Sequence, residues 1–241
     1  ILIEKINSNK HKISFTGKFS RNIGKNNTVS KLLNILDEKK LLNNKKFKVR
    51  IKKKIPSKAG LGGGSMNASN ILNYFLKKNI IKISKKEVIK ISKLVGSDVL
   101  LGLKPTSSIL SGNNEIKRFY NCKKFYSLIV KPQFGCSTRE IYSKVKKFNK
   151  PKFNNPNLKM FNFNYLKKMD NSLEPIALSK YSKLRKIKSF LETLSKPSFV
   201  RMTGSGSALV AYFQSKYRCE IAKKMFHKKY KNYWCILSKT I

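Results

Sequence analysis

The chain has 241 residues, of which 40% are hydrophobic, so it can bury a sizeable core in one large domain or in two domains of about 100 to 150 residues each. No apolar run approaches the roughly 18 residues that a membrane-spanning helix needs, which excludes a helical membrane protein as an interpretation of this sequence. The formal net charge is +43, from 54 Lys and Arg residues against 11 Asp and Glu residues.

The positive charge is spread through every segment of the chain. Lys, Asn and Ile are all frequent, as codon drift in an AT-rich genome would produce. No recognised nucleic-acid-binding motif accompanies the charge, so we favour drift over a polyanion-binding role and expect no specific nucleic-acid partner. A basic nucleic-acid-binding protein remains the alternative from another functional class. In either case the charge should help to attract anionic nucleotides.

The cysteines lack the spacing of a metal site or of a disulfide framework. There is no CxxC pair and no pair of histidines beside them, so neither zinc nor disulfides are indicated, and a reducing cytoplasm fits this usage. The four residues are Cys122, Cys136, Cys219 and Cys235.

A strand, a glycine loop and a helix follow one another between residues 47 and 76. Phe47, Val49 and Ile51 alternate with charged residues and predict a half-buried strand, which Pro56 closes. The glycine-rich residues 60–65 come next. Beyond them, apolar residues at three-and-four spacing predict an amphipathic helix to Leu76.

This order of elements suits a phosphate. The first amides of a helix lack partners and carry partial positive charge, and glycines let the backbone approach an anion closely. Ser65 adds a hydroxyl for phosphate or for a phosphate-bound magnesium ion. The loop lacks the Gly-Lys-Ser/Thr ending of the P-loop and the glycine spacing of the dinucleotide fingerprint. A flexible turn that merely starts a helix is the plainer alternative.

A single carboxylate stands out further along the chain. Ser84 and Glu87 have the spacing of a capping box, and the helix that they predict leads to Asp98. Because Val99 and Leu100 follow it, we expect Asp98 to lie in an apolar setting, where a charge is costly unless it is paired or functional. A structural helix cap is the alternative interpretation of Asp98.

The remainder predicts an α+β second domain, with helices on one face of a mainly antiparallel sheet. A helix capped at Ser137 or Thr138 is expected to reach Phe148, and residues 150–161 are expected to form an exposed connection. The other predicted elements are strands at 125–131, 199–202, 208–213 and 233–237 and helices at 181–194 and 217–230.

Three segments resemble the motifs of the GHMP kinases, a superfamily of small-molecule kinases. Pro56-Ser-Lys-Ala-Gly-Leu-Gly-Gly-Gly-Ser65 resembles the ATP loop, Gly96-Ser-Asp-Val99 the segment with the catalytic aspartate, and Met202-Thr-Gly-Ser-Gly-Ser-Ala208 the third motif. Asn171-Ser-Leu-Glu-Pro175 is also similar to a family segment, which we interpret as a structural helix start. The loop is most similar to the branch that phosphorylates 4-diphosphocytidyl-2-C-methyl-D-erythritol in the non-mevalonate isoprenoid pathway, with Met66 in place of its usual second serine.

The resemblance implies an α+β fold of two domains. The N-terminal ATP-binding domain, residues 1–122, would be like domain 2 of ribosomal protein S5, and the C-terminal domain, residues 123–241, would be ferredoxin-like. It also implies a small-molecule substrate, no membrane, and a monomer or homodimer. A family segment with a catalytic lysine would precede Ile1, so we expect the chain to be truncated at its start.

The resemblance also assigns roles to residues, with ATP and Mg²⁺ as cofactors. Asp98 would be the catalytic acid/base, and Ser65 would in addition contact the metal. Residues expected to bind ATP are Pro56, Ala59, Gly60, Leu61, Gly62, Gly63, Gly64, Ser65 and Met66. Residues expected to bind the substrate are Thr138, Tyr142, Gly204, Ser205 and Gly206.

Several points stay open at this level. Tyr142 can stack on a cytosine or pack in the core of its helix. Within the superfamily, homoserine-type and mevalonate-type kinases are near rivals. A truncated, inactive kinase fold that still binds nucleotide is a further possibility.

Overall fold

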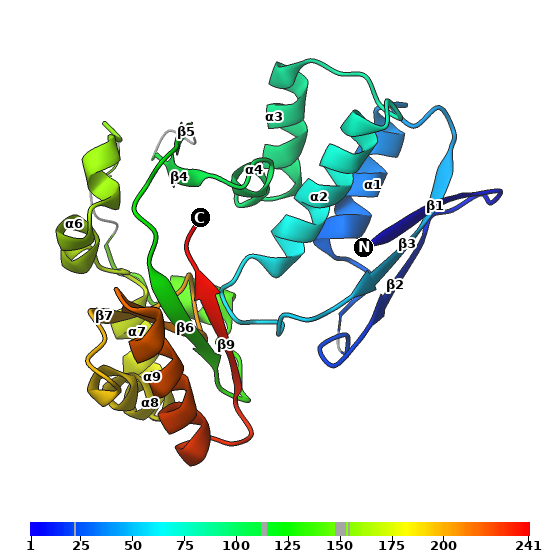
Figure 1. Ribbon diagram of the computed structural model, residues 1–241. Helices are drawn as coiled ribbons and strands as arrows, with labels where there is room; N and C mark the ends of the chain where they lie inside the picture. Colours follow the sequence, from blue (N-terminus) through cyan, green and yellow to red (C-terminus); the bar gives the residue numbers. More distant parts are fainter. Residues whose placement is uncertain (22, 112–114, 148–152, 154) are drawn as a thin grey trace. The chain divides into compact units, whose positions relative to one another are not determined.

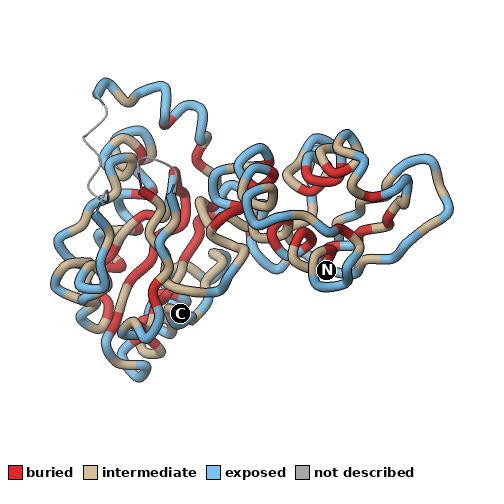
Figure 2. Tube along the Cα trace, turned by 90° about the horizontal axis from the view of Figure 1, so that it is seen from above, coloured by how far each residue is buried: buried red, intermediate tan, exposed pale blue. Residues whose placement is uncertain are grey.

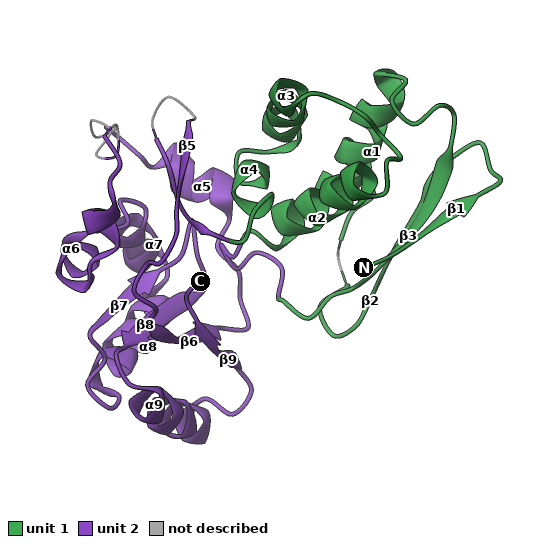
Figure 3. Ribbon diagram, turned by 45° about the horizontal axis from the view of Figure 1, so that its top comes forward, with its two compact units in different colours: residues 1–55, 62–105 green, residues 56–61, 106–241 purple. Residues whose placement is uncertain are grey.

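The computed structural model describes residues 1–21, 23–111, 115–147, 153 and 155–241 (Figure 1). These residues form two compact units, one of residues 1–55 and 62–105 and the other of residues 56–61 and 106–241 (Figure 3). The units divide at residues 105 and 106, so the domain boundary predicted at residues 122 and 123 falls inside the second unit. Ser107, near the start of the second unit's longer segment, is bonded to the end of the chain: its hydroxyl donates to the carbonyl oxygen of Ile241 at 2.8 Å.

The first unit contains a three-stranded sheet. Its strands are β1 (Leu2–Ile6), β2 (Lys12–Thr16) and β3 (Lys46–Lys52), with β3 in the middle, antiparallel to β1 and parallel to β2. Phe47, Val49 and Ile51 are buried while the residues between them are more exposed, as their alternation predicts. The predicted strand at this place is confirmed.

Helices pack against one side of this sheet (Figure 1). They are α1 (Thr28–Glu38), α2 (Gly63–Lys77), α3 (Lys85–Val95) and α4 (Val99–Gly102). The predicted capping box at the start of α3 is only half formed. Ser84 Oγ accepts from the Glu87 amide at 3.2 Å, but the Glu87 carboxylate forms an ion pair with Lys39 at 2.8 Å instead of returning to Ser84.

The second unit contains a four-stranded antiparallel sheet with the order β7-β8-β6-β9. Together with the helices between the strands, this is the β-α-β-β-α-β order of a ferredoxin-like domain. The strands are β6 (Tyr126–Lys131), β7 (Phe199–Met202), β8 (Leu209–Phe213) and β9 (Trp234–Lys239), and a separate hairpin pairs β4 (Ser107–Leu110) with β5 (Ile116–Phe119). The predicted strands are confirmed within two residues at each end.

Helices cover one face of the larger sheet. Alternate strand residues, such as Leu128, Ala211 and Val200, face α8 and α9 and form the buried core. Buried and less buried positions succeed one another along the chain (Figure 2). The helical elements of this unit are α5 (Thr138–Ser143), the 3₁₀ turn η1 (Leu158–Phe161), α6 (Phe163–Lys168), α7 (Glu174–Lys180), α8 (Ser182–Thr193) and α9 (Lys216–Lys229).

The structure of the second unit differs from two predictions made from the sequence. The helix from Thr138 ends at Ser143 and is shorter than predicted, and Phe148 lies outside the described residues. In the expected connection at 150–161, residues 158–161 form η1, and residues 150–152 and 154 lie outside the described part. In the ranges that the structure describes, no helix combines the length and apolar character needed to cross a bilayer.

Candidate active site

The glycine loop is shared between the two units, so each part is described within its own unit. In the first unit, Gly62 caps α2 in the left-handed conformation, with φ 62° and ψ 15°, and no side chain caps the helix. The first helical hydrogen bond runs from the Met66 amide to the Gly62 carbonyl at 2.9 Å. The amides of Gly63, Gly64 and Ser65 therefore lack helical acceptors and form the kind of helix start that binds phosphate.

Asp98 lies at this helix start. A Cβ atom placed on Gly62 would be 3.9 Å from Asp98 Oδ2. Asp98 precedes α4, whose first turn is fixed to α2 because Ser69 Oγ lies 2.8 Å from the Val99 carbonyl oxygen. The sequence of α2 thus holds the backbone that carries the carboxylate.

The expectation of an apolar setting for Asp98 is wrong. Val99 and Leu100 are buried, but Asp98 itself is exposed because it occupies the turn before α4. Asp98 stands at the N-cap position of α4, yet its side chain makes no capping hydrogen bond. The carboxylate is therefore open to a ligand, and the interpretation as a structural cap loses its support.

Ser65 and Met66 differ in what they offer. Ser65 is half-buried and its Oγ lies 3.9 Å from the position of a Cβ atom on Gly96. Its carbonyl oxygen accepts from the Ser69 hydroxyl at 2.8 Å, whereas its own hydroxyl has no hydrogen-bond partner among the described residues. Met66 turns its thioether toward α4, where its Sδ would be 2.8 Å from a Cβ atom on Gly102. Of these two residues, only Ser65 presents a polar side-chain group for phosphate or metal.

Lys53 is a site residue that the sequence did not single out. Its Nζ would lie 3.5 Å from a Cβ atom on Gly63, and burial lowers its pKa below the ordinary 10.5. In the described ranges it has no acidic partner. An unpaired ammonium at the positive end of a helix is unfavourable on its own, and an anion bound there would stabilise both.

In the second unit, the first half of the loop is held by the turn between β7 and β8. The Thr203 hydroxyl donates to the Gly60 carbonyl at 2.9 Å, and the Ala208 amide donates to the Ala59 carbonyl at 3.1 Å. Gly60 has φ 68°, and a Cβ atom on it would lie 2.1 Å from the Thr203 carbonyl oxygen. Pro56 and Ala59 are buried, so this half of the loop is a packed segment.

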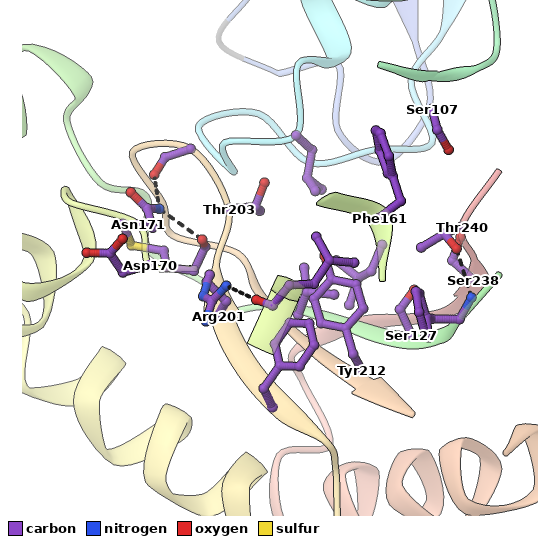
Figure 4. A pocket seen from close by; sticks show the side chains of 18 of the residues that line it. Ser107, Ser127, Phe161, Asp170, Asn171, Arg201, Thr203, Tyr212, Ser238 and Thr240 are labelled. Atoms are coloured by element: carbon purple, nitrogen blue, oxygen red, sulfur yellow. Dashed lines mark hydrogen bonds between the residues drawn. The ribbon is translucent and has the colours of Figure 1, made fainter. Parts of the chain in front are cut away.

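The predicted substrate residues fall into two groups. Thr138 and Ser205 meet through their hydroxyls at 2.8 Å, and Gly206 packs beside Cys136, whose Sγ would be 3.1 Å from a Cβ atom on that glycine. Tyr142 and Gly204 line a separate cavity of about 940 Å³ (Figure 4). Tyr142 is 51% exposed, and the neighbouring Ile141 fills the core instead, so the core-packing interpretation of Tyr142 is wrong.

The floor of this cavity is the face of the larger sheet that faces away from α8 and α9. It presents aromatic and polar side chains, among them Ser127, Arg201 and Tyr212 (Figure 4). Arg201 donates from its Nη1 to the Leu166 carbonyl at 3.0 Å, and burial raises the pKa of Tyr212. Sequence reasoning missed this face. The alternation in β6, β7 and β8 was the available signal, since every second residue had to point away from the core.

No group of three or more His, Cys, Asp or Glu side chains within the described ranges is arranged to hold a metal ion. The side-chain oxygens near the start of α2 include Ser65 Oγ, the Asp98 carboxylate and Thr28 Oγ1, which would lie 2.9 Å from a Cβ atom on Gly64. Such a sparse set fits Mg²⁺, which is usually held by one or two protein oxygens together with substrate phosphates and water.

Comparison with known proteins gives consistent matches. Residues 27–104 match the family model of the GHMP kinases N terminal domain. A protein of Pelagibacter ubique (strain HTCC1062) named 4-diphosphocytidyl-2-C-methyl-D-erythritol kinase is 56% identical over 241 residues, which cover 100% of this chain and 86% of that protein. A protein of the same name from Petrotoga mobilis is 33% identical over 198 residues, covering 76% of this chain and 74% of the relative.

Solved structures show the same fold. A crystal structure of 4-(cytidine 5'-diphospho)-2C-methyl-D-erythritol kinase aligns with a TM-score of 0.71 at 19% identity, over 98% of this chain and 84% of the other. A homoserine kinase from Cytophaga hutchinsonii aligns with a TM-score of 0.74 at 14% identity, over 99% and 84%. At these identities the structural matches speak for the fold alone.

Proposed function

Because this chain belongs to the GHMP kinase family, and within it to the 4-diphosphocytidyl-2-C-methyl-D-erythritol kinases, we propose that it phosphorylates the 2-hydroxyl group of 4-diphosphocytidyl-2-C-methyl-D-erythritol. ATP is the phosphoryl donor, as in kinases of this family. The product would then serve the non-mevalonate route to isoprenoid precursors.

The observation that carries this proposal is the position of Asp98 beside the start of α2, with its Oδ2 3.9 Å from a Cβ atom placed on Gly62. Phosphoryl transfer needs little covalent chemistry from the protein and depends on positioning and on charge stabilisation. In the proposed reaction the open amides of Gly63 to Ser65 bind phosphate oxygens. Lys53 adds a positive charge, and Asp98 accepts the proton of the attacking hydroxyl.

Mg²⁺ completes the proposed site. Ser65 Oγ is the protein oxygen that would hold it, together with phosphate oxygens and water. When bound, the ion neutralises charge on the phosphate oxygens. The chain's own part is to present this hydroxyl and the helix amides in the first unit.

Residues of the second unit are proposed to bind the alcohol substrate. Tyr142 offers an exposed ring face beside a cavity large enough for a nucleotide-sized ligand. Stacking of a base on such a ring contributes about 1 to 3 kcal/mol. The joined hydroxyls of Thr138 and Ser205 offer hydrogen bonds to a polar part of the substrate.

ADP release with Mg-ATP and the cytidylyl alcohol tests the proposal. Asp98→Asn should lower kcat by roughly a hundredfold to ten-thousandfold, because the amide cannot accept the proton. Affinity for ADP should stay within a few-fold of the unmodified protein. Glu4→Gln removes the same charge from an exposed carboxylate in the same unit, which is 3.8 Å from Arg50, and should leave kcat unchanged.

Two results would contradict the assignment. One is full turnover by Asp98→Asn. The other is faster ATP consumption with homoserine or mevalonate than with the cytidylyl alcohol, which would place the chain with another branch of the superfamily.

A further inference from the structure

The side-chain amide of Asn171 joins the turn between β7 and β8 to the segment just before α7. Its Nδ2 donates to the carbonyl oxygens of Met202 at 2.9 Å and of Gly204 at 2.7 Å (Figure 4). Its Oδ1 accepts from the Leu173 amide at 3.0 Å, just before α7. Two donors and one acceptor are required at this position, and among the small side chains only an amide supplies them.

Glu174, three residues later, bonds the amide of Met202, whose carbonyl oxygen is bonded by Asn171. Its Oε2 accepts from the Met202 amide at 2.5 Å, while its Oε1 lies 3.2 Å from Lys188 Nζ on α8. The donor and the acceptor of Met202 are therefore both tied to the start of α7. The turn cannot shift without breaking the charge-assisted hydrogen bond to Glu174 or the two hydrogen bonds to Asn171.

The turn in its place holds the glycine loop. Thr203, which lies between the two carbonyls bound by Asn171, donates its hydroxyl to the Gly60 carbonyl at 2.9 Å. The Gly206 amide donates to the Thr203 carbonyl at 3.0 Å and closes the turn. Gly60 precedes Gly62, the cap of the proposed phosphate-binding helix, by only two residues in the chain.

We propose that Asn171 is a positioning residue for nucleotide binding. It fixes Met202 and Gly204, these residues fix the Thr203 hydroxyl, and that hydroxyl sets the conformation in which Gly60 enters the phosphate-binding helix start. Asn171 acts through Thr203 and does not itself touch the nucleotide. This inference rests on the proposed kinase function, because that function makes residues 60–65 the nucleotide loop.

The affinity for ADP, measured by calorimetry with and without Mg²⁺, tests the proposal. Asn171→Asp keeps the acceptor for Leu173 but replaces both donations with a negative charge against two carbonyl oxygens. We expect the dissociation constant for ADP and the KM for ATP to rise roughly tenfold to a hundredfold, since two carbonyls lose their donors. The KM for the alcohol substrate should change less than threefold, which is about 0.6 kcal/mol.

Asn162→Asp is the matched control. Asn162, in the second unit, caps α6 with its Oδ1, which accepts from the Asn164 amide at 2.8 Å, and among the described residues its Nδ2 has no acceptor. The same change of amide to carboxylate should therefore leave ADP affinity unchanged there. A drop in both variants would show a general effect of added negative charge and would overturn the proposal.

A double-mutant cycle with Thr203→Val tests whether Asn171 acts on nucleotide binding through the Thr203 hydroxyl. If Asn171 acts through the Thr203 hydroxyl, the two substitutions together should weaken ADP binding little more than the stronger one alone. Additive effects would overturn the route. If Asn171→Asp does not fold, Asn171→Ser, which keeps one donor, takes its place with a smaller rise expected in the dissociation constant for ADP.

The outcomes separate this inference from the kinase assignment. ADP binding by the unmodified protein without turnover of the cytidylyl alcohol would contradict the proposed substrate alone. A lowered unfolding temperature with unchanged ADP affinity in the Asn171 variant would make Asn171 merely structural and overturn the inference. Absence of ADP binding by the unmodified protein would overturn both.

Discussion

The two halves of the glycine loop are held in opposite ways. Residues 56–61 belong to the second unit, where Pro56 and Ala59 are buried and the carbonyls of Ala59 and Gly60 accept hydrogen bonds from the turn between β7 and β8. Residues 62–65 belong to the first unit and begin α2 with free amides and no capping side chain. The carbonyls of the first half are hydrogen-bonded within the protein, whereas the second half begins a helix that no side chain caps, as the proposed phosphate site requires.

Glycine is therefore needed for different reasons in the two halves of the loop. Gly60 has to be glycine because a Cβ atom there would lie only 2.1 Å from the Thr203 carbonyl oxygen. Gly63 has open surroundings, with Lys53 Nζ at 3.5 Å and an Ile55 methyl at 3.9 Å from its Cβ position. Glycine at Gly60 serves packing, whereas glycine at Gly63 leaves room beside an unpaired lysine.

Gly60→Ala should give the largest effect. The new methyl group overlaps a backbone oxygen, and φ 68° is a conformation that alanine adopts only at a cost of about 1 to 2 kcal/mol. Relief requires breaking the bonds from Thr203 and Ala208, so we expect a loss of about 3 kcal/mol in the free energy of unfolding. Urea unfolding followed by circular dichroism measures it.

Gly24→Ala is the control for this prediction. Apart from its two chain neighbours, no described residue has an atom within 4 Å of a Cβ atom placed on Gly24, so the same substitution should leave the free energy of unfolding within about 0.5 kcal/mol. Equal stability of the Gly60 and Gly24 variants would show that the first half of the loop is not held by the turn.

The sequence was sufficient to predict the loop, the helix after it and the helix that leads to Asp98. Alternation, glycine clustering and helical spacing are local signals. It could not show that the loop is divided. The partner of Gly60 is Thr203, 143 residues along the chain, and no local pattern reports such a contact. The exposure of Asp98 was missed for a related reason, since its burial depends on how the turn before α4 packs against α2.

Lys53 shows a second limit of local signals. Three consecutive lysines, Lys52, Lys53 and Lys54, stand at the end of β3, which finishes at Lys52, and their chemistry is identical. Only the fold distinguishes them, because Lys53 is half-buried beside Gly63 while its two neighbours are exposed. The site residues predicted from the sequence therefore included no lysine among residues 1–241.

Lys53→Met tests the second half of the loop, residues 62–65. Loss of the positive charge beside the helix start should weaken ADP binding about tenfold, as expected for one charge-assisted hydrogen bond to phosphate. The free energy of unfolding at neutral pH should not fall, since a partly buried, unpaired charge is removed. Lys54→Met, at an exposed neighbour, is the control and should bind ADP as the unmodified protein does.

The pKa of Lys53 gives this prediction a pH signature. Because burial lowers that pKa, the folded protein releases the proton below pH 10.5, where an unfolded lysine still holds it. Below the lowered pKa the ammonium is present and attracts phosphate, so ADP affinity should fall as the pH rises through the folded pKa. Lys53→Arg keeps its charge throughout and should lack this alkaline loss. An unchanged alkaline profile in Lys53→Arg would show that Lys53 does not contact the nucleotide.

Gly63→Ala should give the smallest change, with opposite signs in the two measurements. Gly63 has no positive φ and opens a helix, so alanine should raise the free energy of unfolding by about 0.4 to 1 kcal/mol. Its methyl group would stand 3.5 Å from Lys53 Nζ, in the space where phosphate would meet the helix amides, and should weaken ADP binding a few-fold. Gly60→Ala loses stability and binding together, because it breaks the held half of the loop. A Gly63 variant that lost both would show that the second half is also held by the protein and is not an open site.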